Sequence, residues 1–89
     1  MARMSWEERQ ERREARWYGQ RAARSIANAV FHQREADAWR ALDAGDPAKD
    51  DWLISRWQAR SDLNLEDAVK YARMAAHHAH LSQAEREEP

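Results

Sequence analysis

A run of about 40 residues between Ser5 and Gly45 contains no proline, and this run constrains the fold more than any other feature. Ser5 and Glu8 have the spacing of a capping box, in which each side chain satisfies a free amide at the helix start. Gly45 stands where many helices end in a left-handed residue. We therefore expect one helix over residues 6–44, which at 1.5 Å per residue would be ~60 Å long.

Two shorter helices are expected in the rest of the chain. Asp46 followed by Pro47 is typical of a helix start, and it predicts a helix over residues 47–60. Asn64 with Asp67 three positions later predicts a third helix over residues 64–82, after a turn at 61–64. The predicted fold is all-α, a three-helix bundle in which the two shorter helices fold back on the C-terminal half of the first.

The bundle would be a single helical domain over residues 1–89. Residues 1–22 would project from it as an Arg-rich helical arm, and residues 83–89 would form a frayed acidic tail. The expected aromatic core of the bundle is Trp39, Trp52 and Trp57.

The first helix is too long for the two shorter helices to cover, so we expect self-association along it, most simply as a homodimer. A stripe of small residues lies on one side of this helix. The aromatic residues of its uncovered half would be exposed to solvent unless another chain packed against them. The expected interface residues are Trp6, Ala15, Trp17, Tyr18, Gly19, Ala22, Ala23 and Ile26.

Composition excludes several classes of function. The 89 residues include no Cys, which excludes disulfides and thiolate metal sites. No apolar run approaches membrane-spanning length and no signal-peptide segment is present, so the expected location is cytoplasmic. No phosphate-binding loop or nucleophile motif is found, so neither an enzymatic activity nor a cofactor is expected.

Arginines concentrate at the N-terminus. Residues 1–24 carry seven Arg and four Glu, whereas the formal net charge of the whole chain is -1. Arginine interleaved with aromatic residues suits phosphate neutralisation and base stacking, so Arg9, Arg12, Arg13 and Arg16 are candidate nucleic-acid contacts. The alternative is a solvated helix in which the neighbouring glutamates pair with these arginines.

Histidines form a weaker candidate site. His77 and His80 share one face of the third predicted helix, and His32 and Glu35 share a face of the first. Two such pairs on facing helices would supply four ligands to a divalent ion, although the spacing matches no strong metal motif. The alternative is that histidines near a helix end lie in solvent and favour its dipole.

The sequence thus predicts a small, non-enzymatic protein–protein interaction module that self-associates through its first helix and offers a surface to a protein partner. The alternative function is a nucleic-acid-associated regulator that uses the Arg-rich N-terminal helix. A helical divalent-metal-binding protein is the third hypothesis.

Overall fold

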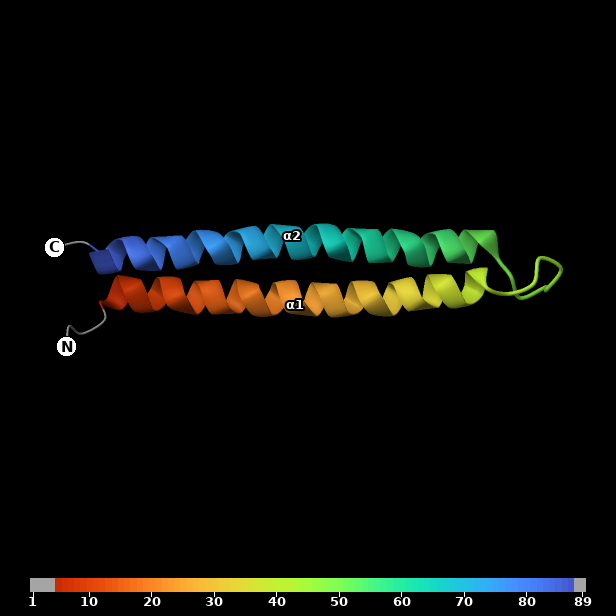
Figure 1. Ribbon diagram of the computed structural model, residues 1–89, viewed down its shortest axis with the longest axis horizontal. Coiled ribbons are helices and arrows are strands. Elements are labelled where there is room, and N and C mark those ends of the chain that lie inside the picture. Colours follow the sequence, from red (N-terminus) through yellow and green to blue (C-terminus); the bar gives the residue numbers. More distant parts are fainter. Residues whose placement is uncertain (1–4, 88–89) are drawn as a thin grey trace.

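The computed structural model describes residues 5–87, which form an extended hairpin of two helices. Helix α1 spans Trp6–Arg40 and helix α2 spans Asp51–Glu87, and the loop 41–50 joins them. The helices lie antiparallel along their whole length, so the start of α1 and the end of α2 meet at the end of the hairpin opposite the loop (Figure 1). We call this end the open end.

The all-α prediction is confirmed, but the three-helix bundle is wrong. The expected turn at 61–64 is helical, and the predicted helices 47–60 and 64–82 are parts of α2. Ser61 is 1% exposed and donates its hydroxyl to the Ala29 carbonyl oxygen at 3.1 Å. Asn64 donates its side-chain amide to the Arg60 carbonyl oxygen at 2.8 Å. Both polar side chains are satisfied within a continuing helix, so nothing forces a turn.

The helix ends follow local side-chain chemistry. Ser5 caps α1, because its hydroxyl accepts a hydrogen bond from the Glu8 amide at 3.0 Å. Helix α1 ends at Arg40 rather than at residue 44, and within residues 5–87 no glycine has a positive φ, so Gly45 is not a left-handed cap. Helix α2 is capped by Asp50, whose carboxylate accepts from the amides of Trp52 and Leu53 at 3.0 and 3.2 Å.

Small residues recur at every seventh position along the contact between the helices. They are Ala15, Ala22, Ala29 and Ala36 on α1, and Ser61, Ala68, Ala75 and Ser82 on α2, where Ile54 occupies the first position of the row. Ala36 is 0% and Ala29 2% exposed. A seven-residue period keeps one seam of each helix on its partner, as in coiled coils, and small side chains at that seam bring the helix axes close.

The N-terminal half of α1 does not project as an arm, because it lies against the C-terminal half of α2 (Figure 1). Glu11 pairs with His78 at 2.5 Å. Residues 83–87, expected to fray, continue α2. The expected aromatic core is also wrong at Trp52, which is 66% exposed. Residues 1–4 of the predicted arm and 88–89 of the predicted tail lie outside the described residues.

Within residues 5–87, neither helix contains an apolar stretch of the length that a bilayer span requires.

Replacing Ala29 with Leu should lower the free energy of unfolding by about 1–3 kcal/mol, because the seam has no room for three more carbons. Ala27→Leu is the matched control, since Ala27 is exposed on the same helix. Chemical denaturation followed by circular dichroism measures both. Equal stability of the two variants would contradict the close seam.

Candidate functional site

The hairpin has two broad faces, which the contacts between the helices identify. On one face Gln33 and Gln58 exchange two side-chain hydrogen bonds at 2.9 and 2.7 Å. On the other face the His32 ring lies 5.4 Å from the Trp57 ring. Residues spaced by seven from these contacts lie on the same face, so the whole surface can be assigned from them.

The first face carries exposed aliphatic side chains near the middle of the hairpin. Ile26 lies two turns before Gln33, and Leu65 lies two turns after Gln58, so the two residues are neighbours across the helices. Val30 and Val69 follow one turn later on their respective helices. Exposed fractions are 50% for Ile26, 44% for Val30, 48% for Leu65 and 51% for Val69. We define the aliphatic face as Gly19, Ala23, Ile26, Val30, Leu65, Val69 and Ala72.

The second face carries most of the aromatic rings in two clusters. Near the open end, Tyr18 stacks on Tyr71 at 6.1 Å and on His78 at 5.4 Å. Nearer the loop, Phe31 packs edge-on against Trp57 at 6.1 Å. These rings are engaged with one another across the two helices, and Arg21 lies over Tyr71 at 5.2 Å. We call this surface the aromatic face.

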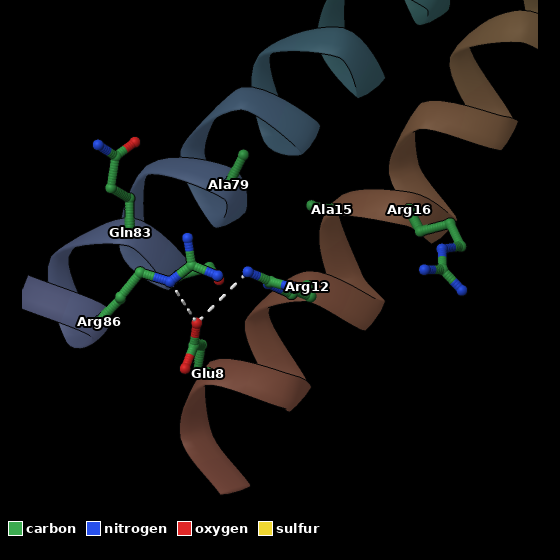
Figure 2. Close-up of a pocket in the computed structure, with 8 residues that line it drawn as sticks. Glu8, Arg12, Ala15, Arg16, Ala79, Gln83 and Arg86 are labelled. Atoms are coloured by element: carbon green, nitrogen blue, oxygen red, sulfur yellow. Dashed lines mark hydrogen bonds and ion pairs between the residues drawn. The ribbon is translucent and has the colours of Figure 1, made fainter. Parts of the chain in front are cut away.

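The open end holds a polar groove between the helices (Figure 2). Its volume is about 460 Å³, and it is lined by Glu8, Arg12, Ala15, Arg16, Ala79, Ser82, Gln83 and Arg86. Glu8 is only 7% exposed and lies at the centre of the ion pairs. Its Oε1 lies 3.5 Å from Arg12 Nη2 and 3.2 Å from Arg86 Nε. Arg16 points away from Glu8 in the same view.

A second hollow adjoins this groove on α1. Its volume is about 260 Å³, and it is lined by four arginines: Arg9, Arg12, Arg13 and Arg16. In the described part of the chain, no carboxylate lies within ion-pair distance of Arg9, Arg13 or Arg16. We call these four residues the arginine row.

The predicted interface residues are distributed over several surfaces. Ala15 and Ala22 lie in the seam with α2, where Ala22 is 7% exposed. Gly19, Ala23 and Ile26 lie together on the aliphatic face. Tyr18 and Trp17 belong to the aromatic face, where Trp17 is 51% exposed. Trp6, at 65% exposure, lies on the outer side of α1.

The predicted metal ligands are far apart. His32 lies beside Trp57, and His78 is 21 residues further along α2, which is about 30 Å. His77 and His80 are exposed and flank His78 in the sequence. Because this part of α2 is so far from His32 and Glu35, the four side chains cannot bind one ion. Among the described residues no group of His, Asp and Glu side chains could hold a metal ion.

Comparison of the chain with family models, curated proteins and solved structures finds no match. Its function therefore has to be argued from its own geometry. The residues that the sequence interpretation missed are Leu65 and Val69, which complete the aliphatic face from α2. Their four-residue spacing was the available signal, but only the hairpin places them beside Ile26.

Glu8→Gln should lower the free energy of unfolding by about 1–2 kcal/mol, because it removes the carboxylate that holds Arg12 and Arg86. Glu7→Gln is the matched control, since it loses a similar interaction with the helix dipole and has no ion pair among the described residues. Thermal unfolding of both variants measures the difference. Equal loss in the two variants would show that the groove's ion pairs contribute nothing.

Proposed function

We propose that the chain is a non-enzymatic protein–protein interaction module that self-associates, with a second copy packed on the aliphatic face. Gly19, Ala23 and Ile26 of α1 would contribute to this interface together with Leu65 and Val69 of α2. Two hairpins packed face to face would form a four-helix bundle, which is a common arrangement for amphipathic helices with short connections.

The observation that supports the proposal is the large solvent-accessible surface area of the hairpin. The chain exposes 7010 Å² at a mass of 10.5 kDa. A compact monomer of this mass exposes about 5,400 Å², so the excess is about 1,600 Å². A standard interface buries about 800 Å² on each partner. The excess is therefore large enough for a stable dimer.

The small hydrophobic core of the hairpin also supports a dimer. Among the residues whose side chains the structure describes, the buried hydrophobic ones are four alanines and Ile54: Ala22, Ala29, Ala36, Ile54 and Ala68. Alanine burial contributes little free energy, and chains of this size rarely gain more than a few kcal/mol from one core. The radius of gyration is 20.0 Å, against about 12 Å for a compact domain of this length. A second copy would supply the missing apolar contact.

The aliphatic face suits a second copy better than the aromatic face does. Gly19, Ala23 and Ala72 beside the larger aliphatic residues allow helices to approach closely. A Cβ built on Gly19 meets no atom within 4 Å, so this position is open toward the outside of the hairpin. The rings of the aromatic face, in contrast, already contact one another across the hairpin.

The double substitution Ile26→Glu and Leu65→Glu should convert a dimer into a monomer, raising the dimer dissociation constant at least about 100-fold, because it places two charges in the interface. Leu63→Glu with Met74→Glu is the matched control, since both residues are exposed at 60% and 36% on the other broad face. Light scattering coupled to size exclusion gives the mass of each protein. A wild-type monomer at tens of micromolar, or an unchanged mass for the first variant, would refute the proposal.

A further inference from the structure

We propose that the arginine row, Arg9, Arg12, Arg13 and Arg16, binds the phosphate backbone of a nucleic acid. The row lies on the same side of α1 as the aliphatic face but nearer the open end: Arg16 comes one turn before Gly19, and the middle of the row is about 20 Å along α1 from Ile26. The four arginines line one hollow of about 260 Å³.

The glutamates of the same segment do not neutralise the row. Rotation by 100° per residue places Glu7, Glu11 and Glu14 on the opposite side of α1 from the four arginines. Glu11 is held there by His78 at 2.5 Å. Glu8 pairs with Arg12 at 3.5 Å, and its buried carboxylate also binds Arg86. Alternating charges in the sequence thus become two separated surfaces in the helix.

The row is unfavourable for the free helix. Its members are spaced by three, four and seven residues, so each arginine has like-charged neighbours one turn away. Such pairs destabilise a helix by a few tenths of a kcal/mol each. Binding of an anionic ligand would offset the repulsion between these arginines. A helix surface with a purely structural role would instead place both signs of charge side by side.

The ligand chemistry follows from the shape of the row. Seven residues of helix span about 10 Å, which matches about three phosphates of one strand at 3.4 Å each. Arginine is suited to this contact because its planar fork binds phosphate oxygens in pairs. Trp6 lies three residues before Arg9 and is 65% exposed, so a ring is available to stack on an unpaired base or sugar. A membrane-binding helix would need a continuous apolar strip beside the arginines, whereas on this side of α1 the arginines occupy residues 9–16 and the aliphatic face begins only at Gly19.

The test is fluorescence anisotropy of labelled single- and double-stranded DNA with the full-length protein at 50 and 200 mM salt. With about three phosphates neutralised, the dissociation constant should rise about 40-fold for double-stranded DNA and about 20-fold for single-stranded DNA between these salt concentrations. The variant Arg9→Gln, Arg13→Gln, Arg16→Gln should bind at least about 10-fold more weakly at 50 mM salt, with a nearly flat salt dependence. It keeps Arg12 and therefore the pair with Glu8.

The matched control is Arg24→Gln, Arg34→Gln, Arg73→Gln, which removes the same charge from exposed arginines outside the row. It should keep binding within a few-fold of wild type. The row variant should also melt at a higher temperature than wild type without DNA, since it relieves repulsion. If the triple variant does not fold, the single variant Arg13→Gln should still reduce the salt slope by about 1.

Absence of DNA binding at 50 mM salt, or equal binding by the row variant and its control, would overturn the proposal. So would binding to phosphatidylserine vesicles without binding to DNA, or a lower melting temperature for the row variant. Light scattering on the same samples separates this result from the dimer proposal, because the row variant should retain the mass of the wild-type protein.

Discussion

The close seam of small residues determines most of this structure. Ala22, Ala29 and Ala36 let α2 approach α1 closely. Because the alanines repeat every seven residues, the same packing would be possible after a shift of seven residues, so they do not determine the register of the two helices. Polar contacts fix it. The Gln33–Gln58 hydrogen bonds, the Ser61 hydroxyl on the Ala29 carbonyl and the Glu11–His78 pair would all be lost if one helix slid by seven residues. Stability and alignment therefore come from different residues.

A seam that holds only small side chains forces the large ones outward. Ile26, Leu65 and their valine neighbours lie on one broad face, and the aromatic rings lie on the other. The rings cover one another across the hairpin, so their area is partly removed from water. The aliphatic side chains are about half exposed, and so are Trp17 and Phe31 on the aromatic face. The two faces differ in the size of their side chains, because small residues beside the aliphatic side chains allow another helix to approach closely, and this is the reason for expecting an occupant on the aliphatic face.

The sequence predicts the features that depend on near neighbours and misses those that depend on the partner helix. Helix content and the Ser5 cap follow from local spacing, and both are confirmed. The break at Ser61–Asn64 is wrong because the same side chains serve a turn or a continuing helix, and only the Ala29 carbonyl decides between them. For the site, the four arginines and their separation from Glu7, Glu11 and Glu14 follow from helical spacing. The pairs Glu8–Arg86 and Glu11–His78 could not be predicted, because they depend on the second helix. The aliphatic face could not be assembled, since half of it comes from the second helix.

Glu8 takes part both in the local cap of α1 and in the contact between the two helices. Its amide completes the local cap with Ser5, as its spacing predicts, while its carboxylate reaches across the seam to Arg86 and back to Arg12. Near the arginine row this carboxylate is largely taken out of solvent, so the charge that could have screened the row is used to close the open end of the hairpin. One carboxylate therefore serves both the fold and the edge of the positive surface: it holds the start of α1 to the end of α2 through Arg86 and pairs with Arg12, whereas Arg9, Arg13 and Arg16 have no ion pair among the described residues.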